Sequence, residues 1–352
     1  MMEKNLFEIL KIISKTKLDS QEKVLLISYL KSENCDIERL FQIIILHKLE
    51  YIFYKHLYDS KILFGCIPSI YTTILSEQFL YLQLKFQEYK EELQTIIASL
   101  KDKNVNYVLI KAGSLIAPLY TFNELIYRGF GDIDILISKA SVDQIHTILL
   151  ENDYVQGYVD EAYEIQEVSR NEKIYWSLNS HQEHKYIKKS RYFKYSPRFY
   201  LNFDVNTSIF EGGKYKDRIS TDYLLNSTTI QNIEGIGETK ILNHEPELLQ
   251  LCYHFYKDTK YDIKKETHDD YCLRKFCDIR EYILKFGTEI DWNLFTAQIS
   301  KWNLEREVYY VLFLVLSFYK DSELEKNLKI IPMEKLNFNI PDWEKILLSN
   351  TK

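Results

Sequence analysis

The chain has 352 residues, of which 46% are hydrophobic and 27% are charged, and its formal net charge is −6. This composition is typical of a folded soluble protein and excludes an intrinsically disordered chain. The acidic balance excludes a protein that coats itself in nucleic acid through its overall charge. Only 10 glycines and 6 prolines occur, which favours a mostly helical protein with one compact irregular region.

The cysteine pattern and the apolar segments indicate in which cellular compartment the protein is expected. The five cysteines are irregularly spaced and form no CxxC pair, so neither a zinc site nor a disulfide framework is indicated. We therefore expect free thiols in a reducing cytoplasm. The N-terminus has no apolar run long enough for a secretion signal. The most apolar window, from Val308 to Phe318, is too short to span a bilayer and is expected to be a buried helix, so no association with a membrane is expected.

Helical periodicity dominates the first hundred residues. Apolar residues recur at helical spacing from Leu6 to Ile13 and again from Leu40 to Leu49. A long helix is expected to start after Pro68 and to run towards Leu100, with an aromatic stripe that we assign to core packing. Residues 1–103 are therefore expected to form an N-terminal helical region.

The character of the sequence changes at Asn104. Residues 105–110 are β-branched and apolar, as in a strand, and Gly113 and Ser114 follow shortly after them. Ser114 is expected to cap a short helix over residues 115–120. A second strand is expected over residues 131–137, and a helix over residues 141–152.

Residues 154–210 are the least helical part of the chain and contain several tyrosine-rich strand candidates. The clearest is 199–206, where apolar and polar residues alternate with the exception of Tyr200. Helical periodicity returns at about Asn243, with Pro246 near a helix start, and further helices are expected over 269–286, 291–300 and 304–319. The predicted fold is α+β and predominantly helical, with a small mixed β-sheet in residues 104–240 between helical regions 1–103 and 241–352.

Two acidic residues stand two positions apart in the second expected strand. Asp132 and Asp134 therefore share one face of the strand, whereas Ile133 and Ile135 face the core. Like charges repel unless a cation or water lies between them, and Mg²⁺ typically takes one or two protein carboxylates together with substrate phosphates. The alternative, which is the commoner one for an isolated pair, is the polar face of an edge strand.

Two further features accompany this pair. Asp204 lies in the later alternating strand, and if that strand lies beside the first, three carboxylates can hold two metal ions for phosphoryl transfer. A surface aspartate is the equally weighted alternative. At Gly113 and Ser114, the backbone can approach a phosphate closely, and the serine hydroxyl can donate to it. Most Gly-Ser pairs after a strand are, however, ordinary turns.

The order of these elements is more specific than any one of them. It resembles the nucleotidyltransferase superfamily that includes DNA polymerase β and the aminoglycoside-modifying adenylyltransferases. Within that superfamily the chain looks like an uncharacterised bacterial nucleotidyltransferase family, whose motif is matched by Lys111-Ala112-Gly113-Ser114, Tyr120, Arg128 and Asp132-Ile133-Asp134. Weaker similarity continues in residues 203–206, 248–254 and 273–278. Two departures occur: Ala112 separates the lysine from the glycine, and Asn206 stands where the family often has a histidine.

The resemblance implies that a nucleoside monophosphate is transferred from a nucleoside triphosphate, expected to be ATP, to a hydroxyl or similar group of a small molecule or peptide, with release of pyrophosphate. It implies that two Mg²⁺ ions are held by Asp132, Asp134 and Asp204, and that Asp204 helps to deprotonate the acceptor. It also implies that Gly113 and Ser114 hold the β- and γ-phosphates, while Lys111 and Arg128 stabilise the charge of the triphosphate.

Several alternatives stay open. Lys111 can instead end its strand in solvent, and Arg128 can instead pair with a nearby acid such as Asp132. The acceptor can instead be a macromolecule, either a protein or a transfer RNA, as for a toxin or regulator, although the acidic charge makes nucleic acid a weaker candidate. A module that binds nucleotide without turnover is the third possibility.

Other residues invite a functional interpretation. His181 and His184 are expected at the surface or in the acceptor site rather than on a metal. They precede a basic stripe, which is more often a solvated face than a surface for an anion; its residues are Lys185, Lys188, Lys189, Arg191, Lys194 and Arg198. We expect His254 to be half-buried and Asp278 to be a hydrogen-bond partner between helices. Cys272 and Cys277 are expected to be core thiols.

Overall fold

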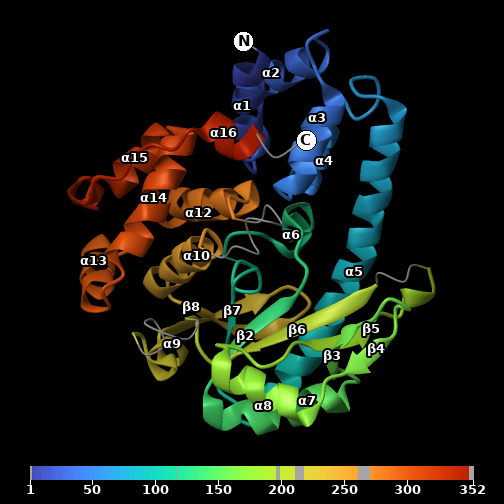
Figure 1. Ribbon diagram of the computed structural model, residues 1–352, viewed down its shortest axis with the longest axis vertical. Coiled ribbons are helices and arrows are strands. Elements are labelled where there is room, and N and C mark those ends of the chain that lie inside the picture. The colour runs from blue at the N-terminus through green and yellow to red at the C-terminus, as the bar shows by residue number, and fades with distance from the viewer. Residues whose placement is uncertain (1, 117, 196–198, 211–217, 261–269, 349–352) are drawn as a thin grey trace. The chain divides into compact units, whose positions relative to one another are not determined.

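The computed structural model describes residues 2–116, 118–195, 199–210, 218–260 and 270–348 (Figure 1). The chain forms two compact units, and both are discontinuous in sequence. The first unit comprises Met1–Leu80, Tyr127–Gly129 and Leu251–Lys352, and the second comprises Tyr81–Ile126 and Phe130–Gln250. The expected division into three consecutive regions stays a prediction.

The first unit is helical throughout its described residues. Three of the described helices run from one unit into the other: α5 (Ser69–Asp102) begins in the first unit, whereas α6 (Phe122–Arg128) and α10 (His244–Asp258) end in it. The other helices of this unit are α1 (Met2–Ile13), α2 (Ser20–Leu30), α3 (Ile37–Leu46), α4 (Glu50–Asp59), α12 (Leu273–Phe286), α13 (Trp292–Lys301), α14 (Glu305–Tyr319), α15 (Ser322–Leu328), η4 (Met333–Leu336) and α16 (Trp343–Leu348). The helices expected over 269–286, 291–300 and 304–319 are confirmed as α12, α13 and α14.

Aromatic packing forms part of the core of the first unit. The apolar window from Val308 to Phe318 lies in α14, and its main apolar side chains are buried, as expected. The ring of Phe318 meets Phe7, Phe276 and Trp343 edge to face, with centroids 5.5 to 5.6 Å apart. Such edge-to-face pairs stabilise a core beyond the area that they bury. Helix α14 is therefore a central element of this unit.

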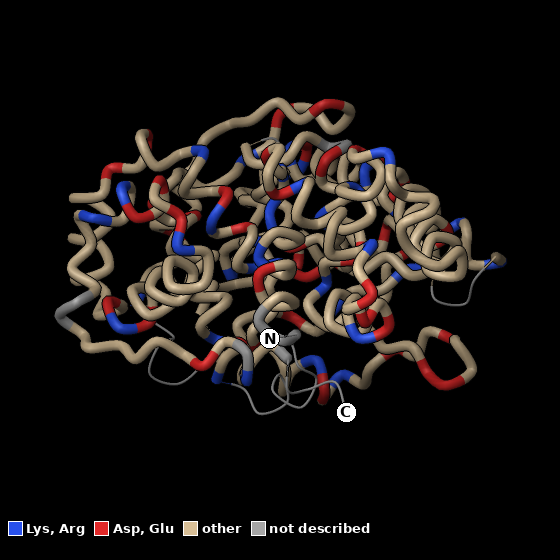
Figure 2. The backbone as a smooth tube through the Cα atoms, turned by 90° about the horizontal axis from the view of Figure 1, so that it is seen from above, with Lys and Arg blue, Asp and Glu red and all other residues tan. Residues whose placement is uncertain are grey.

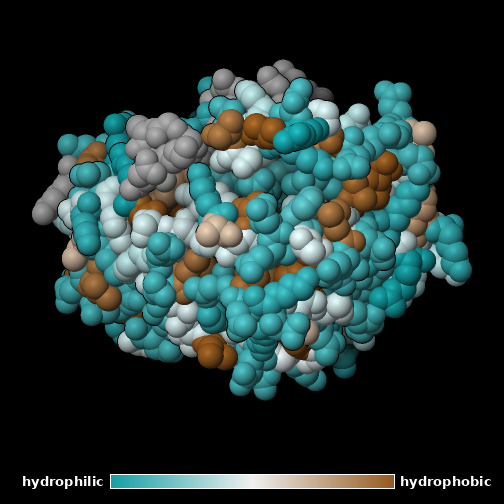
Figure 3. All heavy atoms as spheres, turned by 90° about the horizontal axis from the view of Figure 1, so that it is seen from below, coloured by the Kyte–Doolittle hydropathy of each residue, from teal (hydrophilic) through white to brown (hydrophobic). Residues whose placement is uncertain are grey.

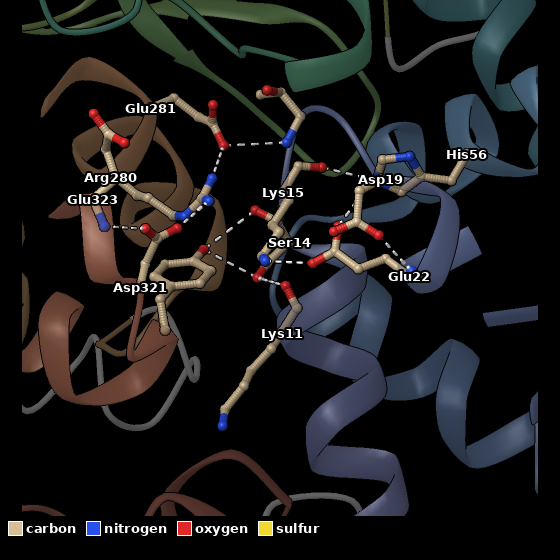
Figure 4. A network of polar contacts seen from close by, with 12 residues as sticks. Lys11, Ser14, Lys15, Asp19, Glu22, His56, Arg280, Glu281, Asp321 and Glu323 are labelled. Atoms are coloured by element: carbon tan, nitrogen blue, oxygen red, sulfur yellow. Dashed lines mark hydrogen bonds and ion pairs between the residues drawn. The ribbon is translucent and has the colours of Figure 1, made fainter. Parts of the chain in front are cut away.

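Polar side chains in the first unit form ion pairs and hydrogen bonds with one another and with the backbone (Figure 4). Arg280 donates to Glu281 and to Asp321, at 2.5 Å in each case. The Nε2–H of His56 donates to the carbonyl oxygen of Lys15 at 2.8 Å, and burial of the ring lowers the pKa of His56 to about 4. Buried groups with such partners contribute to a defined packing of the helices.

The second unit is built on a mixed sheet of eight strands, in the order β4-β3-β5-β6-β2-β1-β8-β7. Strands β2 and β6 are parallel, as are β1 and β8, whereas the other neighbours are antiparallel. The strand bounds are β1 (Tyr107–Ile110), β2 (Ile133–Ile137), β3 (Val155–Val159), β4 (Ile165–Glu167), β5 (Tyr186–Lys189), β6 (Tyr200–Asn206), β7 (Thr228–Ile233) and β8 (Gly237–Leu242). The predicted fold class, α+β and predominantly helical with a mixed sheet, is confirmed.

The helices of the second unit lie between these strands in sequence. Besides the C-terminal part of α5 and the start of α10, they are α6 (Phe122–Arg128, up to Ile126), η1 (Lys139–Ser141), α7 (Val142–Glu151), α8 (Arg170–Asn179), η2 (Phe193–Tyr195) and α9 (Thr221–Asn226). The short helix expected over 115–120 is wrong, because the described residues there form turns. Pro118 lacks the backbone N–H that a helix at this place would need.

The hairpin of β7 and β8 was not among the expected elements. Its turn contains Gly235 and Gly237, whose φ angles of 74° and 93° lie in the left-handed region that favours glycine. Both glycines and the β-branched residues before them are visible in the sequence, so a signal was present. Strand β8 lies beside β1 and extends the sheet beyond the strand that carries the Gly113 turn.

Charged residues of both signs are distributed along the chain, and apolar residues are scattered on one face of the molecule. Lys and Arg are interspersed with Asp and Glu along the chain (Figure 2). On the face shown in Figure 3, hydrophobic residues form small separate groups among hydrophilic ones. Within the described residues, the structure contains no helix whose length and apolar character would allow it to cross a membrane.

Candidate functional site

Asp134 and Asp204 lie side by side in the sheet of the second unit. Strands β2 and β6 run parallel, and Asp134 is the register partner of Asp204 (Figure 1). Asp132 stands two residues before Asp134, directly ahead of β2. Because side chains alternate along a strand and register partners share a face, the three carboxylates lie on one side of the sheet. The condition on which Asp204 could join the other two, that its strand lies beside theirs, is met.

Asp134 is buried, whereas Asp132 and Asp204 are half-buried, and the three carboxylates influence one another. Asp134 is 1% exposed. Burial raises its pKa, and the charge of Asp132 adds to this effect, although Lys111 opposes it. Burial, followed by the charges of Asp134 and Asp132, raises the pKa of Asp204 to about 7. Two carboxylates that share a site disfavour each other's ionised form, and a nearby cation relieves this repulsion.

Lys111 supplies one such cation. Its Nζ lies 2.5 Å from Oδ1 of Asp134. Burial alone would lower the pKa of Lys111, but the charges of Asp134, Asp132 and Asp204 raise it above its usual value. The residue has a φ of 54°, so the chain turns sharply where β1 ends. The side chain therefore belongs to the carboxylate cluster, and the alternative that Lys111 ends its strand in solvent is wrong.

Asn206 fixes the orientation of Asp134. Its Nδ2 donates to Oδ1 of Asp134 at 3.1 Å and to the carbonyl oxygen of Ile135 at 3.3 Å. Its Oδ1 is buried and has no hydrogen-bond partner among the described residues. At the position where the family often has a histidine, this chain thus holds an amide whose oxygen is available to a ligand.

The Gly113 turn faces inward. The hydroxyl of Ser114 is fully buried and lies 2.8 Å from the carbonyl oxygen of Lys111 and 2.6 Å from Oε1 of Glu247, to one of which it donates at a time. In this structure, the hydroxyl of Ser114 therefore bonds to groups of the protein and not to a ligand. In the part of the chain that the structure describes, the backbone N–H groups of Ala112, Ser114 and Leu115 have no acceptor. Neighbouring backbone donors of this kind form the concavities that bind anions.

Arg128 is paired with an acid of its own unit. It belongs to the first unit, where its guanidinium makes a bidentate ion pair with Asp278, at 2.6 to 3.0 Å. Both side chains are buried. The alternative that Arg128 pairs with an acid is therefore confirmed, although that acid is Asp278 and not Asp132, the example given. The interpretation of Asp278 as a partner between helices is confirmed, because the pair joins α6 to α12.

A tyrosine that sequence analysis assigned to the core also belongs to the site. The hydroxyl of Tyr89, on α5, donates to the carbonyl oxygen of Gly131 at 2.6 Å and accepts from the backbone N–H of Asn202 at 2.9 Å. It thereby ties the segment before Asp132 to the strand of Asp204. The ring is buried as expected, but helical periodicity carries no information on where the hydroxyl finds its partners.

The donor set can be tested against Mg²⁺. Carboxylate oxygens and the unpaired Oδ1 of Asn206 are the hard oxygen donors that Mg²⁺ prefers. Within the described residues, no group of three or more His, Cys, Asp or Glu is arranged to hold a metal ion by itself. Mg²⁺ in phosphoryl-transfer enzymes is typically bound by one or two carboxylates and by substrate phosphates. The residues present fit an ion that arrives together with a nucleotide.

The two histidines before the basic stripe are not at the surface. His181 and His184 are both buried, which contradicts a surface position, whereas their expected alternative place in the acceptor site stays a prediction. Burial lowers the pKa of His184, and its ring lies edge to face with Trp176, with centroids 5.3 Å apart. His254 is half-buried, and Cys272 and Cys277 are buried thiols, as expected.

The basic stripe is largely paired with acids of the same unit. Lys188 lies 2.8 Å from Glu92, and Lys189 lies 2.6 Å from Glu164. Arg191 pairs with Glu88 at 3.5 Å and with Glu91. Lys185 differs, because it is exposed and its charge acts on Asp204. Arg198 lies outside the described residues.

A comparison with protein-family models matches residues 33–320 to a family described as uncharacterised nucleotidyltransferase. No curated protein and no solved structure matches the chain. The family match covers most of the chain and includes the three aspartates, the Gly113 turn, Lys111 and Arg128. The chain therefore belongs to the uncharacterised nucleotidyltransferase family.

Proposed function

We propose that this nucleotidyltransferase is metal-dependent and belongs to the DNA polymerase β-type superfamily, and that it transfers AMP from ATP to a hydroxyl of a small molecule or peptide. Pyrophosphate is the second product. Family membership supports nucleotidyl transfer in general. The observation that carries the proposed site is the register pairing of the buried Asp134 with the half-buried Asp204, close in sequence to Asp132.

Each residue of the site has a distinct role in the proposed reaction. Asp132 and Asp134 bind the Mg²⁺ ions, and Asp204 binds the second ion and takes the proton of the acceptor hydroxyl. Two bound Mg²⁺ ions would stabilise the charge on the attacking and leaving oxygens. The ammonium of Lys111 opposes the rise in the pKa of Asp134, and Asn206 orients the carboxylate of Asp134. The backbone N–H groups of the Gly113 turn donate to oxygens of the triphosphate.

The charge distribution favours a small acceptor over a nucleic acid. Binding to nucleic acid is dominated by cationic side chains that meet phosphates. Three cations of the basic stripe, Lys188, Lys189 and Arg191, are instead paired with carboxylates. The acidic net charge of −6 points in the same direction.

Labelled nucleoside triphosphates, Mg²⁺ and a panel of acceptors test the proposal, with pyrophosphate release as the readout. Asp134→Asn is expected to lower the rate by at least about 1000-fold while the fold stays intact. Asp143→Asn, at an exposed position on α7, is the matched control and is expected to keep full activity. An active Asp134→Asn enzyme would show that the metal assignment is wrong.

The same assay separates the alternatives. Label on small compounds supports the proposal, whereas label on protein or RNA supports a macromolecular acceptor. Thermal stabilisation by nucleotide without any pyrophosphate would identify a binding module.

A further inference from the structure

A second pocket, polar and about 250 Å³ in volume, lies in the second unit beyond the ends of β2 and β6. Its lining includes Ser138, directly after β2, and Ser208, shortly after β6. These serines stand four residues after Asp134 and Asp204, which is about 13 Å in an extended chain. The three aspartates do not line this pocket, so it is a space separate from the carboxylate cluster.

Hydrogen bonds fix the walls of the pocket. The backbone N–H groups of Thr207 and Ser208 donate to the carbonyl oxygen of His181, at 2.8 and 3.2 Å. The hydroxyl of Thr221 donates to the carbonyl oxygen of Thr207 at 2.6 Å. These bonds join the end of β6 to the segment after α8 and to α9. The pocket is therefore formed before a ligand binds, which lowers the entropic cost of binding.

Three serines of the pocket have a hydroxyl proton to offer. The oxygens of Ser180, Ser208 and Ser220 each accept from a backbone N–H group two or three residues further along the chain, at 3.0 to 3.3 Å. Among the described residues, the three hydroxyl protons have no acceptor. A hydroxyl whose oxygen already accepts one hydrogen bond presents its proton as a donor. The pocket therefore offers three neutral donors to a ligand.

Two charged side chains complete the lining. Lys139 and Asp222 are both exposed, and neither makes an ion pair with a described residue. With the serines, Lys139 gives four donor groups, and the three terminal oxygens of a phosphate monoester match them better than the two of a carboxylate. Asp222 would repel a second anionic group, but its oxygens accept hydrogen bonds from hydroxyl groups.

We propose that this pocket binds a small phosphorylated polyol. Lys139 and the three serines hold its phosphate, and Asp222 accepts hydrogen bonds from its hydroxyl groups. The carbon chain of the ligand packs against Leu178 and Ile219, which also line the pocket. The inference goes beyond the proposed function and does not depend on the reaction that the carboxylates catalyse.

Glycerol 3-phosphate is the probe, because it is small and has both a phosphate monoester and hydroxyl groups. Calorimetric titration of the full chain, without nucleotide, measures its affinity. Lys139→Met is expected to weaken binding by about 10-fold or more, the loss of one charge-assisted hydrogen bond, and Lys139→Arg to restore most of the affinity. Ser208→Ala is expected to weaken binding by about 3-fold or more. Lys101→Met, at an exposed position on α5, is the matched control and is expected to bind like the wild type.

Glycerol and inorganic phosphate test the two halves of the ligand. Glycerol is expected not to bind, and inorganic phosphate is expected to bind more weakly than glycerol 3-phosphate. Asp222→Ala should lower the affinity for glycerol 3-phosphate relative to that for inorganic phosphate. An unchanged ratio of the two affinities would overturn the assignment of the ligand's hydroxyl groups to Asp222.

Thermal midpoints separate lost binding from misfolding. Because Lys139 and Asp222 are exposed, their variants are expected to unfold at the temperature of the wild type. Glycerol 3-phosphate that does not bind the wild type, or that binds Lys139→Met and Ser208→Ala equally well, would overturn the inference.

The inference and the proposed function fail in different ways. Asp134→Asn is expected to bind glycerol 3-phosphate like the wild type, because Asp134 does not line the pocket. Binding in a protein that releases no pyrophosphate from any nucleotide would support the pocket and refute the transferase function. Binding that is lost in Asp134→Asn would contradict a site separate from the carboxylates.

Discussion

The two units differ in the partners of their buried charges: opposite charges are paired in the first unit, and like charges lie together in the second. In the first unit, Arg128 is matched to Asp278, and Arg280 is matched to Glu281 and Asp321. In the second unit, Asp134 lies beside Asp204, and burial together with the charge of Asp132 raises the pKa of both. Matched pairs are what a structural role requires, whereas like charges kept together are typical of a functional site. The contrast supports the proposal that the active site lies in the second unit.

Breaking the matched pair of the first unit should have the largest effect on stability. Arg128→Met leaves Asp278 buried without its guanidinium, and we expect a loss of about 3–5 kcal/mol in the free energy of unfolding of that unit. Urea denaturation followed by circular dichroism measures it. Arg191→Met removes an arginine whose side chain is 50% exposed and should cost less than about 1 kcal/mol.

This comparison also tests the sequence-based role of Arg128. If Arg128→Met is as stable as Arg191→Met but has a raised KM for the nucleotide, the arginine acts on the triphosphate. That outcome would contradict the assignment of the Arg128–Asp278 pair to architecture.

Acid should weaken the first unit through His56. Its pKa is about 4 in the folded protein and about 6.5 in an unfolded chain, so the unfolded state binds more protons between these values. The contribution of neutral His56 to the free energy of unfolding is therefore fully present above pH 6.5. It is lost as the pH falls towards 4, and the total loss is about 3 kcal/mol. Lys55 adds to the lowering of this pKa, whereas Asp59 and the carbonyl oxygen of Lys15 oppose it.

Denaturation midpoints at several pH values, for the wild type and His56→Gln, check this expectation. The glutamine amide can still donate to the carbonyl of Lys15 but does not titrate. The wild type should lose more stability than the variant between pH 6.5 and 4. Parallel pH profiles of the two proteins would show that His56 does not titrate on unfolding.

Local sequence patterns predicted the parts of this protein that depend on neighbouring residues. The spacing of Asp132 and Asp134 in a strand fixes their common face, and alternation around Asp204 identifies its strand. The helices α5, α12 and α14 follow from periodicity over many turns. The error at 115–120 arose because the capping signal of Ser114 was weighed without the effect of Pro118.

Those local patterns could not predict contacts between residues that are far apart in the sequence. Asp278 stands 150 residues from Arg128, and Glu247 stands 133 residues from Ser114. Tyr89 follows the periodicity of a long helix, and that periodicity does not reveal that its hydroxyl bonds to Gly131 and Asn202. Such pairings depend on how the strands and helices pack in three dimensions, and local patterns in a single sequence do not predict them.

The unfolding of Asp204→Asn at pH 8, without and with Mn²⁺ in place of Mg²⁺, tests the central claim most directly. Without metal the variant should be more stable than the wild type by about 1 kcal/mol or more, because each unit by which a pKa is raised corresponds to about 1.4 kcal/mol. Mn²⁺ should stabilise the wild type and leave the variant unchanged. A variant that is less stable than the wild type without metal, and that gains as much from Mn²⁺, would contradict the claim that these acids are kept together to bind a cation.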